Sequence, residues 1–187
     1  INYYKSKFFA EQEIHNGIKK GLDAVILNPC QIVGSLDYNY TPLIFENLKK
    51  GAMKGIPQGS SVIGHVRDYA KAHVVAYDKG RTGENYLLGG VHATYQEVFD
   101  TVGGLLNIKT PTRPLPKSLL NLVAFILGKV SLITNAEPLL TPEKVTLLND
   151  TMAVSSRKAE EELGFSTCSL NEMFNDCYQW MLQEKMI

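Results

Sequence analysis

Hydrophobic and polar positions along the first 107 residues predict helices and strands that follow one another in turn. Residues 3–20 contain no proline, are rich in Lys, Glu, Gln, Phe and Ala, and end near Gly21, which is typical of a helix with a glycine stop. A short apolar run then lies between Gly21 and Pro29, and it predicts a buried strand of the parallel type. That strand ends at Asn28 and Pro29, on the side of an open α/β sheet where ligands bind.

Further elements up to residue 107 are bounded by turn or cap residues. Asp68 is expected to cap one helix, and Thr94 with Glu97 three residues later has the pattern of a capping box at the start of another. In chain order the expected elements are a short helix at 42–50, a loop at 51–61, a strand at 62–66, a helix at 69–79, a strand at 85–90 and a helix after Thr94. Strands that alternate with helices predict βαβ units and a parallel sheet.

The chain changes character near residue 110. Residues 110–116 are rich in proline, residues 116–134 have a strongly apolar helical pattern, and residues 155–163 and 170–184 also have helical patterns. The sequence therefore predicts an α/β fold, with a sheet in residues 1–109 and a mostly helical lobe in residues 110–187.

The apolar helical stretch is too short for a membrane span. Residues 119–133 fall below the ~20 residues that a span needs, and Lys129 lies among them. A buried or interfacial helix is expected, and burial in the core is favoured over a lipid or sterol contact. No charged segment followed by an apolar one opens the chain, so a cytoplasmic location is expected.

Charge and cysteine content narrow the classes of partner. Nineteen basic and nineteen acidic residues give a net charge of zero, so no broad field attracts nucleic acid. The three cysteines have no CxxC spacing, which argues against a disulfide framework and a zinc site and favours reduced thiols. The four histidines lack the pairing four residues apart that a metal site on one helix often uses, so no metal is assigned.

Candidate chemistry begins with Tyr3 and Lys7. They are four positions apart at the start of the first expected helix, so their side chains lie on one face about a turn from each other. A tyrosine ordinarily titrates near ~10, and a nearby ammonium stabilises its phenolate, so the phenol can exchange a proton with a carbonyl or hydroxyl nearer neutral pH. The same ammonium can bond a ribose. Surface tyrosines and lysines also often have this spacing without any catalytic role, so the context decides.

Motifs around and after this pair supply that context. Residues 3–7 read Tyr-Tyr-Lys-Ser-Lys, and the others are Ala-Glu at 10–11, Asn-Pro at 28–29, Ile-Val-Gly at 32–34, His-Val-Arg-Asp-Tyr-Ala-Lys-Ala-His at 65–73, Gly-Glu-Asn-Tyr-Leu-Leu-Gly-Gly at 83–90, Ala-Glu-Glu-Glu-Leu-Gly-Phe at 159–165 and Trp180. In this order and spacing they resemble the extended short-chain dehydrogenases/reductases of the NAD-dependent epimerase/dehydratase family. The resemblance covers nearly the whole chain and is greatest to the dihydroflavonol-reductase-like branch, which includes hydroxysteroid dehydrogenases and sugar epimerases.

The resemblance implies roles for individual residues. Tyr3 is then the general acid/base, and Lys7 holds the nicotinamide ribose and tunes Tyr3. The expected cofactor-binding residues beside Lys7 lie at the end of the first strand and just after it: Asn28, Pro29, Ile32 and Val33. Without Tyr3, the Asn-Pro pair reads simply as a strand that ends in a turn, and Asp68 is treated as a family marker rather than a catalytic group. The fold implied is a partial Rossmann-like parallel sheet with a helical substrate-binding lobe.

The resemblance also indicates what this sequence lacks. The glycine-rich phosphate turn of the family, the residue that selects NAD or NADP, and the Ser/Thr that precedes the catalytic tyrosine are absent. NAD or NADP is therefore expected in a complete protein, and no cofactor is expected to bind this chain alone. A gene shortened naturally or by design, proteolysis of a longer protein, and pairing with a separate N-terminal half all remain open. A half-sheet exposes an edge and an apolar face, so a homodimer or association with a missing N-terminal half is expected.

The function expected is that of an NAD(P)-dependent oxidoreductase acting on a secondary alcohol or ketone. Residues 35–61 and 110–148, expected to shape the substrate pocket, are rich in Leu, Ile, Pro and Phe, and Arg113 is their only arginine. A nucleotide-sugar diphosphate calls for more cationic groups, so an apolar or aromatic alcohol/carbonyl substrate is favoured. A nucleotide-sugar epimerase/dehydratase fragment and a non-catalytic binding module are the alternatives.

Overall fold

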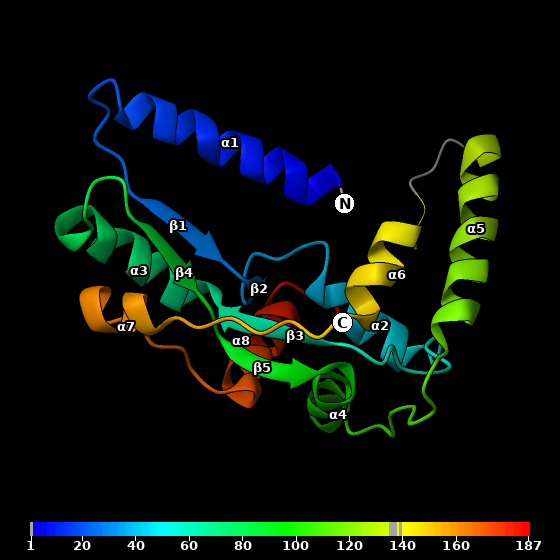
Figure 1. The fold of residues 1–187 in the computed structure, drawn as a ribbon. Coiled ribbons are helices and arrows are strands. Elements are labelled where there is room, and N and C mark those ends of the chain that lie inside the picture. The colour runs from blue at the N-terminus through cyan, green and yellow to red at the C-terminus, as the bar shows by residue number, and fades with distance from the viewer. Residues whose placement is uncertain (1, 135–137, 139) are drawn as a thin grey trace.

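The structure is a computed structural model that describes residues 2–134, 138 and 140–187, with strands at its centre and helices around them (Figure 1). The helices are α1 (Asn2–Ile18), α2 (Thr41–Lys49), α3 (Val66–Lys79), α4 (Tyr95–Leu106), α5 (Lys117–Thr134), α6 (Pro142–Asn149), α7 (Arg157–Leu163) and α8 (Leu170–Gln183). The strands are β1 (Ile26–Pro29), β2 (Gln31–Val33), β3 (Ser60–His65), β4 (Asn85–Leu88) and β5 (Val91–Thr94).

The strands form two small sheets. β1 pairs with β4 in parallel, and β3 pairs with β2 in parallel and with β5 in antiparallel orientation. The chain passes from the first sheet to the second at Cys30, between the end of β1 and the start of β2. The predicted α/β fold with a parallel sheet is confirmed, and β5 adds one antiparallel edge that the sequence did not predict.

The larger core lies where α2, α4 and α8 pack on β2 and β3. Phe45 of α2 and Phe174 of α8 are fully buried there, and Phe45 stacks on Tyr178 with ring centroids 5.6 Å apart. Deleting a buried phenylalanine ring of this kind typically destabilises a domain by about 3–5 kcal/mol. The last helix of the chain therefore helps to hold strands that lie far before it in the sequence.

A second core lies between α3, β4 and α7. The ring of Tyr69 stacks on Phe165 with centroids 6.0 Å apart, and its hydroxyl donates a hydrogen bond to the Gly89 carbonyl at 2.9 Å. Burial raises the pKa of Tyr69, so this phenol stays protonated as a donor. A third, small cluster joins α5 to α6 through Leu120, Ala124 and Val145.

Most expected elements are confirmed, with small shifts at their ends. The helix near the N-terminus, the strand that delivers Asn28 and Pro29, and the capping box of Thr94 and Glu97 are all observed. The strand β1 is only half-buried rather than buried, since β4 is its sole described strand neighbour. The sequence did not predict α6, β2 or β5.

The prediction that Asp68 caps a helix is wrong. β3 runs directly into α3, so His65 occupies the capping position and Asp68 lies in the first helical turn. The Asp68 carboxylate instead accepts a hydrogen bond from the Cys168 backbone N–H at 3.0 Å. Its role is to hold the segment before α8 against the start of α3.

The prediction that the apolar stretch at 119–133 lies in the core is also wrong for most of its described side chains. Among the described side chains of α5, only Leu120 and Ala124 are buried, whereas Phe125 is 62% and Ile126 is 51% exposed. The physical reason is that α5 packs mainly against one short helix, α6, at one end of the molecule (Figure 1). None of the helices within the described residues combines the length and apolar character that crossing a membrane requires.

Candidate active site

Tyr3 and Lys7 lie on one face of α1, as the sequence predicts. The Lys7 ammonium lies 5.5 Å from the centroid of the Tyr3 ring, over its face, so the cation and the phenol are neighbours. The Tyr3 side chain is 58% exposed, and none of the described side chains of α1 is buried. The structure brings the pair together and leaves it open to a ligand.

Glu11, one turn further along α1, connects this helix to the strands. Its carboxylate accepts hydrogen bonds from the side-chain amides of Asn85 on β4 at 2.6 Å and Asn28 on β1 at 3.5 Å. The second of these is long, so the contact with Asn85 is the stronger one. None of the described side chains of α1 is buried, so the hydrogen bonds of Glu11 are its main contacts with the sheet that ends at Asn28 and Pro29.

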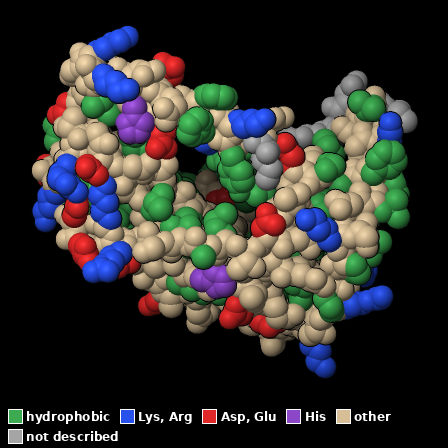
Figure 2. All heavy atoms as spheres, viewed as in Figure 1, with side chains coloured by type: hydrophobic (Ala, Val, Ile, Leu, Met, Phe, Trp, Pro, Cys, Tyr) green, Lys and Arg blue, Asp and Glu red, His purple; other side chains and the backbone are tan. Residues whose placement is uncertain are grey.

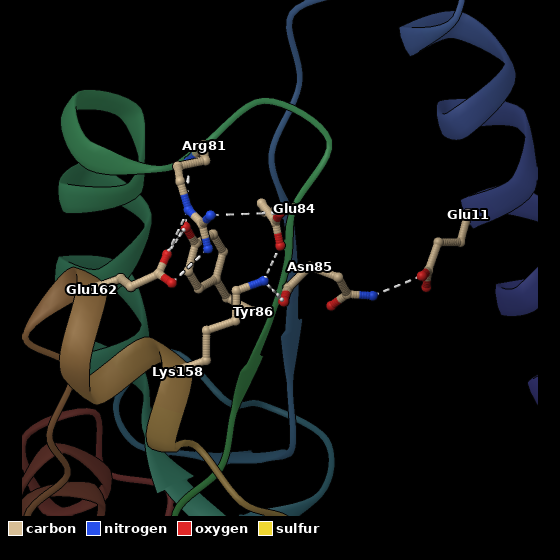
Figure 3. A network of polar contacts seen from close by, with 7 residues as sticks. All are labelled: Glu11, Arg81, Glu84, Asn85, Tyr86, Lys158 and Glu162. Atoms are coloured by element: carbon tan, nitrogen blue, oxygen red, sulfur yellow. Dashed lines mark hydrogen bonds and ion pairs between the residues drawn. The ribbon is translucent and has the colours of Figure 1, made fainter.

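The contact between Glu11 and Asn85 is one end of a larger polar network (Figure 3). The Lys158 ammonium of α7 donates to the Asn85 carbonyl oxygen at 3.1 Å, forms an ion pair with Glu84, and lies 4.6 Å from the centroid of the Tyr86 ring. The Tyr86 hydroxyl donates to Glu162 at 2.6 Å. The network thus joins α7, β4 and α1.

Glu162 closes the far end of this network. Arg81, just after α3, donates to both of its carboxylate oxygens, at 3.0 and 2.6 Å (Figure 3). Hydrogen bonds from Tyr86 and then from Arg81 hold the pKa of Glu162 below its ordinary value. This bidentate pair keeps the start of β4 in place relative to α7.

The other predicted cofactor-binding residues follow Asn28 along the chain. Pro29 is exposed at the end of β1, and Ile32 is 44% exposed on β2. The Val33 side chain is 1% exposed and belongs to the larger core, so its side chain faces away from any surface ligand. Pro29 and Ile32 thus offer an apolar surface where the chain passes from one sheet to the other.

A hollow lies beneath α1, and hydrophobic side chains gather at its margin (Figure 2). On α1, burial and then the nearby Asp150 carboxylate raise the pKa of Tyr4. Burial likewise raises the pKa of Tyr95 at the start of α4, with a smaller contribution from Tyr4. These phenols stay protonated near neutral pH and can donate hydrogen bonds to an oxygen of a ligand.

A second set of reactive side chains lies away from α1. His65, Asp68 and Cys168 place one potential metal-ligating atom each within 4.8 Å of one another, beside a groove of about 410 Å³. Two of these groups already have protein partners: His65 Nε2 lies 3.1 Å from Asp176, and Asp68 accepts from the Cys168 N–H. The sequence could not reveal this cluster, since Cys168 is one hundred positions beyond Asp68.

The role of Glu11 was missed at the sequence level, although Glu11 is part of the quoted Ala-Glu motif. The available signal was its position: residues 3, 7 and 11 are spaced by four and lie along one side of a helix. That spacing places a carboxylate in line with the Tyr3 and Lys7 pair. It does not reveal that two asparagines from separate strands converge on it.

Comparisons with known proteins agree with the resemblance in the sequence. A model of the NAD dependent epimerase/dehydratase family matches residues 1–89. The chain is 28% identical over 185 residues to a Synechocystis protein whose name refers to dihydroflavonol 4-reductase, covering 95% of this chain and 54% of that protein. It is 27% identical over 192 residues to sterol demethylase protein B of Methylococcus capsulatus, covering 100% of this chain and 58% of that protein.

Solved structures show the same fold. The crystal structure of gox2253 has a TM-score of 0.79 at 30% identity, covering 99% of this chain and 57% of that one. A nucleoside-diphosphate-sugar epimerase from Pseudomonas aeruginosa has a TM-score of 0.79 at 22% identity, covering 100% of this chain and 57% of that one. The chain thus spans about half the length of the relatives it matches.

Proposed function

We propose that the chain, whose residues 1–89 match the NAD dependent epimerase/dehydratase family, is the catalytic and substrate half of an NAD(P)-dependent oxidoreductase. Its reaction moves a hydride between nicotinamide and a secondary alcohol or the corresponding ketone. One observation carries the proposal: Tyr3 and Lys7 are neighbours on α1, and Glu11 ties the same helix to the strand that ends at Asn28 and Pro29.

Each residue of the pair has one task in this reaction. In the direction of reduction, the Tyr3 hydroxyl gives its proton to the carbonyl oxygen as hydride reaches the carbonyl carbon, and in oxidation it takes the proton back. Lys7 stabilises the Tyr3 phenolate left after proton donation and bonds a ribose hydroxyl. NAD or NADP, when bound, supplies or accepts the hydride.

The described residues fit one end of the cofactor. Exposed Pro29 and Ile32 offer an apolar surface for a nicotinamide ring, next to the carboxyl end of β1. Among the described residues, the pyrophosphate end of the cofactor has no comparable surface. A phosphate-binding glycine turn connects a strand to a helix, whereas the glycine-containing residues 51–59 connect the helix α2 to the strand β3. We propose that the chain alone does not hold the cofactor and is inactive until a segment with a phosphate turn joins it.

That segment is proposed to meet the surface that α1 and β1 leave uncovered. Among the described residues β1 has only β4 as a strand neighbour, so one edge of β1 is open. Tyr4, Phe8 and Phe9 of α1 are 47%, 59% and 64% exposed. An N-terminal half of the same fold, or a second copy, covers these groups in our proposal. Residues 110–187 are proposed to supply the substrate lobe.

The substrate is proposed to be an apolar or aromatic alcohol or carbonyl compound. The hollow beneath α1 has a hydrophobic margin, and Arg113 is the only arginine of residues 110–148 (Figure 2). Names of two relatives refer to a dihydroflavonol and a sterol, which agrees with such a substrate. A nucleotide-sugar epimerase is the second candidate, favoured by the family description and by the fold of the Pseudomonas aeruginosa structure.

A binding measurement tests the first part of the proposal. Intact mass first verifies the purified chain, and NADH and NADPH are then titrated against it by fluorescence. We expect no saturable binding below the millimolar range, because the pyrophosphate has no site. Saturable micromolar binding contradicts the proposal that this chain lacks a binding site for the pyrophosphate of the cofactor. UDP-glucose titrated in parallel separates the candidates, since tight binding of that sugar nucleotide favours the epimerase.

A further inference from the structure

One apolar face of α5 is left exposed by the described part of the chain. Leu119, Leu122, Val123, Ile126 and Val130 recur at the spacing of one helix face, and their exposed fractions are 45%, 56%, 38%, 51% and 46%. Leu120 and Ala124, which pack on α6, belong to a separate stripe of the same helix. α5 therefore has two apolar faces, of which the described part of the protein covers only one.

The charged residues of α5 and of the segment that leads into it are all of one sign. Residues 101–134 contain four cations, Lys109, Arg113, Lys117 and Lys129, and no acid, although the whole chain has a net charge of zero. All four side chains are exposed, and none has an ion pair with a residue that the structure describes. The Lys129 ammonium lies 5.5 Å from the centroid of the Phe125 ring, so its stem lies along apolar surface while its charge remains at the rim.

We propose that this face of α5 docks on the surface of an anionic lipid bilayer. An exposed apolar helix face flanked by cations lies in the plane of a membrane interface, with its apolar side chains among the acyl chains and its cations at the headgroups. Each cation near an anionic leaflet adds to the binding, so Lys117 and Lys129 of α5 are complementary to that surface.

Two other occupants explain the observations less well. A second copy that docked α5 on α5 would bring two sets of unpaired cations together, and like charges repel. A missing N-terminal half is expected at the open edge of β1, whereas α5 lies at the opposite end of the molecule from the β1 and β4 pair (Figure 1). The proposal does not depend on the catalytic assignment, because it uses no residue of α1.

Flotation with vesicles tests the proposal on the 187-residue chain. We expect the protein to float with vesicles of phosphatidylcholine and phosphatidylglycerol, and to bind pure phosphatidylcholine at least tenfold more weakly. The variant Leu122→Gln/Ile126→Gln is expected to lose at least tenfold in binding. Lys117→Gln/Lys129→Gln is expected to lose the preference for anionic vesicles. The matched control is Val74→Gln, because Val74 is 69% exposed on α3, away from this face.

Two further measurements make each result decisive. Thermal unfolding checks that the exposed substitutions leave the fold intact, and light scattering after size exclusion reports the oligomeric state. No flotation by the wild-type chain overturns the proposal, as does equal flotation of the wild type and the Leu122→Gln/Ile126→Gln variant. A dimer that this variant converts to a monomer, without any binding to vesicles, assigns the face to a second copy instead.

Discussion

The carboxylate of Glu11 accepts a hydrogen bond from the side-chain amide of Asn85 at 2.6 Å, and this contact fixes α1 to β4 (Figure 3). Helices in proteins are stabilised mostly by packing of an apolar face, and none of the described side chains of α1 is buried. The placement of Tyr3 and Lys7 therefore depends on a contact two turns away from Tyr3. Since Lys158 in turn contacts Asn85, α7 also supports that placement.

Replacing Glu11 with Ala is expected to loosen α1 and leave the rest of the chain unchanged. A hydrogen bond to a charged group contributes about 1.5–3 kcal/mol, and partial exposure lowers this to about 1 kcal/mol, so α1 amides are expected to exchange roughly fivefold faster. Hydrogen exchange followed by mass spectrometry measures this for peptides of α1 and of the α8 core.

Glu13→Ala is the matched control, because Glu13 is exposed on the same helix and has no hydrogen bond within the described residues. The Glu11→Gln variant keeps an acceptor oxygen and is expected to recover part of the protection. Equal exchange in Glu11→Ala and Glu13→Ala would show that α1 is held by something other than Glu11.

Asp68 is expected to matter for global stability because it joins two distant parts of the chain. Asp68→Ala leaves the Cys168 N–H without its acceptor, which costs about 1–3 kcal/mol. Urea unfolding at neutral pH measures the loss. Asp78→Ala, an exposed acid on the same helix, is expected to change the free energy of unfolding by less than about 0.5 kcal/mol. A loss of the same small size for Asp68→Ala contradicts the structural role given to its carboxylate.

Asp68 and Thr94 show what the sequence can reveal and what it cannot. Local signals suffice for the capping box of Thr94 and for the glycine stop after α1, because the residues involved are neighbours in the chain. Asp68 has the same local signal as a cap, yet β3 runs into α3 without a loop, so the helix starts earlier. Its true partner, the Cys168 N–H, lies in a segment that no local pattern connects to α3.

The candidate site likewise has features that the local sequence predicts and features that depend on how distant segments pack. The spacing of Tyr3 and Lys7 alone predicts their shared helix face, and the structure agrees. The burial of Val33 and the convergence of Asn28 and Asn85 on Glu11 depend on how separate strands pack. The apolar pattern of α5 predicts a helix correctly, but a pattern cannot tell which apolar face has a partner.

Asp37 is expected to make the free energy of unfolding depend on pH in the acidic range. Burial acts to raise its pKa, but hydrogen bonds from the backbone N–H groups of Tyr40, Thr41 and Asn39 outweigh burial, so its pKa is lowered. A carboxylate with a lowered pKa stabilises the fold above its unfolded pKa, near ~3.9, and this contribution is lost as pH falls through the folded value.

The variant Asp37→Asn tests this pH dependence. At pH 6 it is expected to be about 0.5–1 kcal/mol less stable than the wild type, since an Asn side chain has one acceptor oxygen and leaves the Thr41 N–H without its partner. In urea unfolding at pH 3 and below, the difference is expected to shrink, because the wild-type carboxylate is then becoming protonated. A difference that stays constant between these pH values contradicts the assignment, and Asp78→Asn serves as the control.

Hydride transfer tests whether Tyr3 is the proton donor and acceptor. The measurement follows absorbance of NADH and NADPH at 340 nm with secondary alcohols and ketones, using the chain assembled with a segment that carries a phosphate turn. General acid–base catalysis contributes about 10²–10⁴-fold, so Tyr3→Phe is expected to lose that much turnover with its fold intact. Tyr77→Phe, at a 91% exposed position on α3, is expected to stay within about fivefold of the wild type, because Tyr77 lies outside the candidate site. Wild-type turnover in Tyr3→Phe, or an equal loss in Tyr77→Phe, contradicts this role of Tyr3.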